Sequence, residues 1–260
     1  MLSEREANIL STLAQMRFMT TSQIHRLHGY LGEYGLKVTR RLLVKLEQDG
    51  LIMAWQPTKY AQKIHYLTKL GAKTMEYCYG YEHIPTFRRN EKALHQTYVS
   101  EAYVALKTAG PGQLHRFAIN KKYGEVIPDA VIDYEWNGRL YTIYLEVDTG
   151  NESLLYLRDV KLAKYLRTFS GYPDPGARRS IVFLTLQEHR RNALRRMTEP
   201  DPLPISVFGV EELSANPSIL FDESIIPRRE FFANFVRPPQ TIHEGPGSEA
   251  NNETPPNDLP

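Results

Sequence analysis

Residues 128–148 read PDAVIDYEWNGRLYTIYLEVD, and this stretch decides how the larger part of the chain is expected to fold. Two runs rich in β-branched and aromatic residues, Ala130–Trp136 and Leu140–Val147, are typical of β-strands. Between them stand Asn137 and Gly138, a pair that readily takes the positive φ values of a two-residue hairpin turn. The stretch therefore predicts a β-hairpin.

The sequence on either side extends this hairpin into a sheet covered by helices. We expect a helix over about 91–107 and a strand over 113–119 before it. After it, the pattern predicts helix, strand, helix and strand over about 154–169, 180–186, 187–197 and 205–210. Helix, meander, helix and buried strand in this order indicate an α/β sandwich. We assign this second domain to residues 91–237.

Three carboxylates stand at the ends of the two hairpin strands. Asp129 precedes the first strand, while Glu146 and Asp148 end the second on one face, because side chains alternate along a strand. Such carboxylates repel one another unless a hard cation lies between them, and Mg²⁺ held in this way can activate a water. Glu101 on the preceding helix could add an oxygen, so we predict a Mg²⁺ site of Asp129, Glu146 and Glu101. The alternative is that Asp129 caps a turn and the strand-end acids are solvated charges.

The first third of the chain has a different pattern. Helices are expected over about 3–16, 20–28 and 36–48, followed by two β-like runs and a further helix that ends before Gly80. Three short helices followed by a hairpin is the order of a winged helix-turn-helix domain. We assign this domain to residues 1–90.

Basic side chains gather on the third of these helices. They recur at spacings of three and four, so they share an outward face that fits the major groove of DNA. Residues 1–92 hold 14 Lys and Arg against 8 Asp and Glu, which favours a polyanionic partner. The alternative is a solvated face on a dimerisation domain. The predicted DNA-binding residues are Lys37, Arg40, Arg41, Lys45 and Gln48 on the helix, and Lys59 and Lys63 at the hairpin tip.

Composition excludes several classes of protein. The 260 residues are 42% hydrophobic and 24% charged, as in globular proteins, and the single cysteine, Cys78, excludes an internal disulfide framework. No apolar run is long enough to span a membrane, and the acidic start of the chain does not resemble a signal peptide, so we expect a cytoplasmic protein. The sequence has no glycine-rich phosphate loop, nucleophile elbow or HExxH, which argues against an NTPase, a serine hydrolase and a zinc protease.

The end of the chain is unlike the rest. Residues 238–260 hold six of the 17 prolines, four acidic residues and no basic residue. Such a segment buries too little apolar surface to offset the entropy of ordering it. We therefore predict a disordered acidic tail.

Five short segments, in a fixed order, carry a resemblance to a known family. They are His65–Gly71, Leu94-His95, Pro128–Ala130, Leu145–Asp148 and Lys161–Tyr165. Over about residues 5–210 the chain resembles the replication-relaxation family of plasmids and integrated mobile elements. The resemblance implies an α+β protein: an N-terminal winged helix-turn-helix followed by an α/β domain similar to PD-(D/E)XK nucleases. It also implies a role in plasmid replication or DNA relaxation.

The nuclease pattern is matched in part. Asp129 and Glu146 stand where the pattern has its two acids, but Asp148 stands where it has a lysine that polarises the attacking water. Lys161 on the next helix could substitute, because it shares a helix face with Arg158 and Tyr165. The alternative is that Lys161 is a surface lysine or a phosphate contact. The candidate catalytic residues are thus Asp129, Glu146, Asp148 and Lys161.

Three hypotheses for the function follow. The first is a DNA-binding protein of a plasmid or another mobile element, acting on double-stranded DNA in replication or relaxation or in their control, alongside replication or relaxase proteins of that element. The second is an active Mg²⁺-dependent endonuclease that nicks DNA. The third is a protein-interaction module in which the winged helix forms a dimer.

Overall fold

The computed structural model describes residues 2–32, 34–88, 92–171, 178–201 and 203–222. The predicted tail, 238–260, and the last part of the predicted second domain, 223–237, lie outside these residues. In the part of the chain that is described, no helix is both long and apolar enough to cross a membrane.

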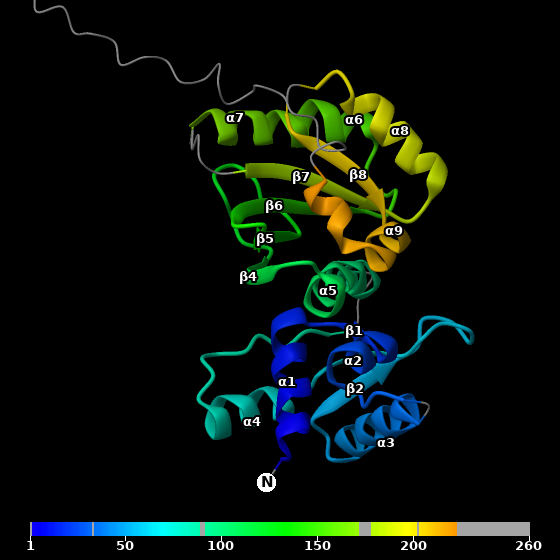
Figure 1. Cartoon of the computed structure of the whole chain (residues 1–260). Helices are drawn as coiled ribbons and strands as arrows, with labels where there is room; N and C mark the ends of the chain where they lie inside the picture. The colour runs from blue at the N-terminus through cyan, green and yellow to red at the C-terminus, as the bar shows by residue number, and fades with distance from the viewer. Residues whose placement is uncertain (1, 33, 89–91, 172–177, 202, 223–260) are drawn as a thin grey trace, which may run out of the picture.

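The N-terminal part, called the winged helix below after the predicted fold, combines, in the residues described, four helices with a small sheet (Figure 1). A three-stranded antiparallel sheet, in the order β1-β3-β2, packs beside the helices. The elements are α1 (Glu4–Met16), β1 (Met19–Thr20), α2 (Thr21–His28), α3 (Gly35–Gln48), β2 (Ile52–Trp55), β3 (Ile64–Leu67) and α4 (Lys69–Tyr79). The three helices and the hairpin follow the predicted order, while β1 is an additional short strand that the sequence did not indicate.

Local capping explains where these helices begin. The Ser3 hydroxyl accepts a hydrogen bond from the Glu6 backbone N–H, and the Glu6 carboxylate accepts one from the Ser3 N–H, so α1 starts with a capping box. Thr20 and Gln23 form the same reciprocal pair at the start of α2. These side chains satisfy backbone N–H groups that have no partner within the helix.

The second part is built on a five-stranded sheet in the order β4-β5-β6-β7-β8. β4, β5 and β6 pair antiparallel, and β7 and β8 continue the sheet in parallel. Asn137 and Gly138 both have positive φ, as the predicted hairpin turn requires. The strands are β4 (Gln113–Ile119), β5 (Ala130–Trp136), β6 (Arg139–Asp148), β7 (Arg178–Thr185) and β8 (Ile205–Gly209).

Helices cover both faces of this sheet (Figure 1). On one face lie α5 (Lys92–Ala109), α9 (Val210–Ala215) and the 3₁₀ turn η2 (Pro217–Phe221). On the other lie α6 (Leu154–Tyr156), the π-helical segment η1 (Leu157–Leu162), α7 (Ala163–Gly171) and α8 (Glu188–Thr198). The predicted α+β class is confirmed. The sequence did not indicate α9 or η2, and the helix expected over 154–169 contains a π segment.

Helix α5 joins the two parts. It lies between the winged helix and the sheet (Figure 1), and one continuous core contains residues from both. Gln23 Nε2 of α2 donates to the Thr97 carbonyl at 2.8 Å, and the Ser100 hydroxyl donates to the Phe18 carbonyl at 2.8 Å. The domain boundary expected near residue 90 stays a prediction. Helix α5, which follows it, packs against the winged helix as well as against the sheet.

Candidate functional site

Asp129 and Glu146 lie opposite each other where β5 begins and β6 ends. Ala130 pairs with Leu145 in the antiparallel ladder, so the next residues outward, Asp129 and Glu146, are neighbours. The Val147 N–H donates to Asp129 Oδ2 at 2.8 Å. Glu146 is only 2% exposed. Burial, with a smaller contribution from the charge of Asp129, raises the pKa of Glu146 to about 7. Burial also raises the pKa of Asp129.

Lys161 reaches this pair from the π segment η1. Its Nζ lies 2.9 Å from Glu146 Oε2 and 3.2 Å from Glu152 Oε2. Burial alone would lower the pKa of Lys161, but the carboxylate of Glu146 raises it above its ordinary value, so the side chain is a cation. The Tyr165 hydroxyl donates to Glu146 Oε1 at 2.7 Å. Both oxygens of Glu146 therefore have a partner. The π-helical segment η1 that carries Lys161 is of a kind frequently found at functional sites.

Asp148 has a different environment from Glu146. The Arg190 guanidinium on α8 holds it, with Nε 2.6 Å from Oδ2, and the Gly150 N–H donates to Oδ1 at 3.0 Å. Arg190 also donates to the Glu152 carbonyl at 2.5 Å. The carboxylate of Asp148 is thus occupied by contacts that fix the chain after β6.

Glu101 does not join the acidic site. Its carboxylate is paired with Arg26 and accepts hydrogen bonds from Gln23 Nε2 at 2.9 Å and from the Ser214 hydroxyl at 2.7 Å. These partners come from α2 and α9, so Glu101 ties the winged helix to the second part of the chain. The sequence placed Glu101 on the right helix but could not show which elements pack against it.

His95 is a site residue to which sequence reasoning assigned no role. It lies on α5, and its Nε2 is 3.0 Å from Asp129 Oδ1. The two oxygens of Asp129 are therefore bound by His95 and by the backbone of Val147. The only sequence signal was the Leu94-His95 segment of the family resemblance.

A cavity of about 580 Å³ lies beside the acidic site, and His95, Asp129 and Lys161 are among the residues that line it. It extends from the end of β6 and the start of α5 to the turn after α1, so both parts of the chain line it. Its charged or titratable lining residues include Asp129, Asp148, Glu152, Lys161, His95 and Arg17.

The donor atoms at this site suit a hard divalent cation. Asp129 and Glu146 offer carboxylate oxygens from adjacent strands, and each is buried enough to raise its pKa. Mg²⁺ is often held by one or two carboxylates, with waters and substrate oxygens as its other ligands. Within the described residues no group of three or more His, Cys, Asp and Glu is arranged around a metal position. The fit is therefore to a two-carboxylate site without Glu101.

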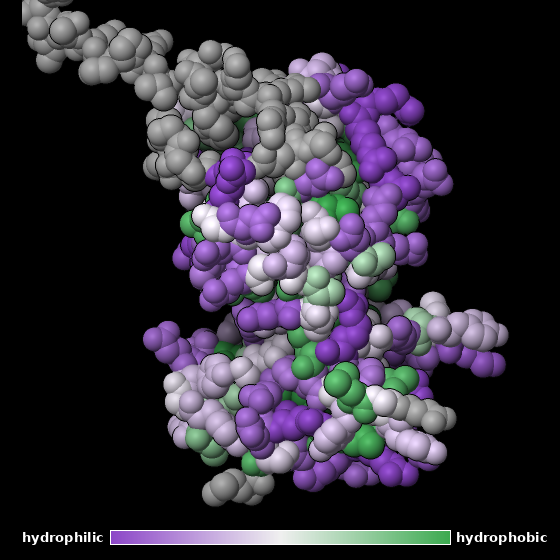
Figure 2. Space-filling view, viewed as in Figure 1, coloured by the Kyte–Doolittle hydropathy of each residue, from purple (hydrophilic) through white to green (hydrophobic). Residues whose placement is uncertain are grey.

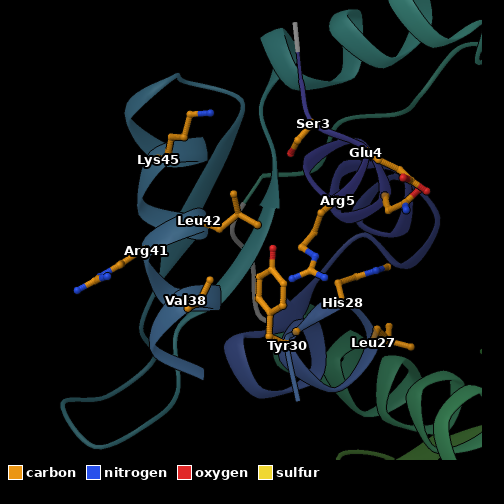
Figure 3. A pocket seen from close by; sticks show the side chains of 12 residues that line it. Ser3, Glu4, Arg5, Leu27, His28, Tyr30, Val38, Arg41, Leu42 and Lys45 are labelled. Carbon is orange, nitrogen blue, oxygen red and sulfur yellow. The ribbon is translucent and has the colours of Figure 1, made fainter. Parts of the chain in front are cut away.

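Exposed cations lie on the predicted recognition helix. Lys37, Arg40 and Arg41 are exposed on α3, and no ion pair joins them to a carboxylate of the described residues. Figure 3 shows Arg41 pointing away from Arg5, whose guanidinium lies 3.4 Å from the centroid of the Tyr30 ring. Gln48, at the end of α3, is also exposed. This surface is open to a large ligand.

The other predicted DNA-binding residues are partly committed to contacts within the chain. Lys45 Nζ lies 2.6 Å from Glu6 Oε1, and Lys63 Nζ lies 4.0 Å from Glu47 Oε2. Lys59 lies at the β2–β3 loop beside Tyr60, which is 92% exposed. This loop projects from the body of the protein (Figures 1 and 2).

Helix α8 carries four arginines on a hydrophilic surface (Figure 2). Besides Arg190, Arg191 lies 3.2 Å from Glu212, and Arg195 donates to the Val207 carbonyl at 3.1 Å. These three arginines therefore hold α8 to the end of the sheet and to α9, and are less available to a phosphate than the cations of α3.

Comparison with known proteins identifies the family. A model of the family described as Replication-relaxation matches residues 10–197, well over half of the chain. No curated protein matches. Among solved structures, restriction endonuclease FokI is similar at a TM-score of 0.34 and 14% identity, over 86% of this chain and 45% of that chain. FokI bound to DNA is similar at a TM-score of 0.30 and 14% identity, over 89% and 47%. This chain thus spans less than half the length of either. By its match to the family model, the chain belongs to the replication-relaxation family.

Proposed function

We propose that the chain is a DNA-binding protein of a plasmid or another mobile element, which acts in the cytoplasm in replication or DNA relaxation or in their control. The observation that carries this proposal is the exposed cationic face of α3, Lys37, Arg40 and Arg41. An α-helix fits the major groove of double-stranded DNA, and long cations there reach phosphates and guanine edges. The β2–β3 loop, with Lys59, would contact the backbone beside the helix.

A mobility shift with linear and supercoiled plasmid tests DNA binding. The double variant Lys37→Ala and Arg41→Ala should raise Kd by about tenfold or more and lower the slope of log Kd against log salt by about 2. The matched control is Lys73→Ala, which removes an exposed cation from α4. Equal binding by the double variant and the control would contradict the role of α3.

A second candidate function is favoured by the position of Lys161. The nuclease pattern requires a lysine beside its second acid, and Lys161 Nζ lies 2.9 Å from Glu146 Oε2 although it comes from a different element. We therefore propose that the acidic site cleaves DNA. In the nuclease pattern a lysine stands at the position of Asp148, and we propose that Lys161 performs the role of that lysine. Asp148 then has a structural role through Arg190.

The side chains of the acidic site would have different roles in the proposed cleavage. Asp129 and Glu146 would hold Mg²⁺, which supplies a more acidic water and stabilises charge on the phosphate. His95 and the Val147 N–H orient Asp129, and Tyr165 orients Glu146. Lys161 is a cation at the edge of the cavity, where it can orient a water or bind a phosphate oxygen.

Incubation of supercoiled plasmid with Mg²⁺, Mn²⁺ or EDTA tests cleavage. The expected result is metal-dependent nicking that Glu146→Ala abolishes and Glu82→Ala, at an exposed position in the loop after α4, leaves intact. If the chain shifts the mobility of DNA but yields no metal-dependent cleavage product, it is a DNA-binding protein without nuclease activity.

The third hypothesis, a protein-interaction role with a dimer formed by the winged helix, predicts a different outcome. The chain would then bind neither plasmid form, and its sedimentation would depend on concentration. Replication or relaxase proteins of the same element are proposed partners whether or not the winged helix forms a dimer.

A further inference from the structure

The backbone at Arg17 is strained. Its φ is 70° and its ψ is −56°, and the Phe18 N–H donates to the Met16 carbonyl at 2.8 Å. This is a γ-turn of the rare hand, a conformation that residues other than glycine seldom adopt. Strained backbone of this kind persists only where the surroundings enforce it, and it gathers at functional sites.

The surroundings of Arg17 do enforce this turn. The Arg17 N–H donates to the Leu13 carbonyl at 2.8 Å, which closes α1, and the Ser100 hydroxyl holds the Phe18 carbonyl to α5. The Arg17 guanidinium lies over the Phe87 ring, 4.6 Å from its centroid. Backbone and side chain are both fixed, so the cation has a defined position.

That position is on the cavity of the acidic site. Arg17 lines the cavity together with Asp129 and Lys161, although it belongs to the winged-helix part of the chain. Among the described residues no carboxylate forms an ion pair with it. Burial lowers the pKa of Arg17, which is the mark of a cation that lost water without gaining a counter-ion.

We infer that Arg17 binds a phosphate of the DNA strand that enters the acidic site. This inference rests on the proposed function. A guanidinium is the side chain best suited to two parallel hydrogen bonds with a phosphate, and a flat aromatic ring beneath it keeps its plane fixed. Lys92, at the start of α5, lines the same cavity and adds a second cation to the path of the strand. The winged helix would thus supply part of the nuclease-like site as well as its own DNA-binding surface.

The test uses the full chain and a short duplex, with Ca²⁺ in place of Mg²⁺ because Ca²⁺ also binds carboxylate oxygens. Arg17→Met should raise Kd about tenfold and lower the salt slope by about 1, as expected for one lost phosphate contact. Arg17→Lys should restore part of the affinity. The matched control, Arg139→Met, removes an exposed arginine seven residues before Glu146 on β6, about 23 Å away at the rise of a strand.

A second variant separates binding from folding. Arg17→Gly relieves the positive φ, so its thermal midpoint should equal or exceed that of the natural chain while its Kd rises as in Arg17→Met. A loss of affinity that is accompanied by a lower midpoint in Arg17→Gly would assign Arg17 to folding and overturn the inference.

Failure of the inference differs from failure of the proposed function. If Arg17→Met matches Arg139→Met in Kd and salt slope, the inference is wrong even where the chain nicks plasmid. If the chain binds DNA and Arg17→Met lowers the slope, the phosphate contact is established even without nicking. If the natural chain binds no DNA at low salt, both proposals fail.

Discussion

The cationic face of α3 and the acidic site of the sheet satisfy their charges in opposite ways. Lys37, Arg40 and Arg41 are exposed and have no carboxylate partner among the described residues, so their charge is available to a ligand. Glu146 is buried and each of its oxygens is bound, by Lys161 and by Tyr165. A polyanion bound at the first surface would neutralise charges that have no carboxylate partner among the described residues. In the second, the side chains are already held in place by one another. Substitutions should therefore change binding at α3 and change both stability and chemistry at the acidic site.

The largest effect is expected from Lys161→Met, because it removes the cation from a buried carboxylate. The free energy of unfolding should fall by about 3 kcal/mol, and the proposed nicking should fall by about a hundredfold. Urea unfolding and the plasmid assay measure the two effects. Lys121→Met, at an exposed position, is the control. If Lys161→Met has the stability of the natural chain, the ion pair of Lys161 with Glu146 does not stabilise the fold, and the acidic site differs less from α3 than its contacts indicate.

Arg190→Met should be nearly as destabilising but should leave Glu146 and Lys161 in place. Asp148 would lose the partner whose Nε lies 2.6 Å away, at a cost of about 3 kcal/mol for an isolated buried carboxylate. The double variant Arg190→Met and Asp148→Leu should recover much of that loss. Urea unfolding curves of the two variants measure the loss and recovery of stability. A nicking rate of the double variant within a few-fold of the natural rate would agree with a structural role for Asp148. Complete loss of nicking in a stable double variant would return Asp148 to the catalytic residues.

A pH effect of intermediate size is expected within the winged helix. Burial, and less strongly the charge of Lys63, lowers the pKa of His65 to about 4. Glu47 Oε1 lies 3.5 Å from the His65 Nδ1. Because the unfolded chain binds the proton more readily, stability is lost as pH falls from about 6.5 to 4, by about 2 kcal/mol. The neutral variant His65→Gln should lose less stability over that range. Urea unfolding at several pH values measures the stability of both chains. If their stabilities depend equally on pH, His65 is not a neutral buried side chain.

The smallest effect separates two cations of one helix. Arg41→Ala should weaken DNA binding about threefold to tenfold, and Lys45→Ala should weaken it less, because Lys45 is already paired with Glu6. Mobility shifts at two salt concentrations make this comparison. A larger loss from Lys45→Ala than from Arg41→Ala would mean that the Glu6 pair opens when DNA binds.

Local rules account for the parts of this protein that the sequence predicted well. The hairpin at Asn137-Gly138 and the capping box at Ser3 depend on residues within a few positions of one another, so their patterns are visible in the chain. The spacing of Lys37 and Arg41 on α3 is equally local. The pairing of Asp129 with Glu146 was also within reach, because a hairpin turn fixes the register of the two strands.

Ion pairs between residues far apart in the chain could be identified only from the folded structure. It joined Arg190 to Asp148, Arg26 to Glu101, and His95 to Asp129, in each case between different elements. It also brought Arg17 to the cavity of the acidic site through the packing of α1 against α5. Spacing along the chain carries no information about such contacts, since burial and helix packing select one partner from many similar charges. Local patterns in the sequence therefore predicted most of the helices and strands and the spacing of Asp129 and Glu146, but not β1, α9 or η2. The fold determined which charges are paired and which are exposed to a ligand.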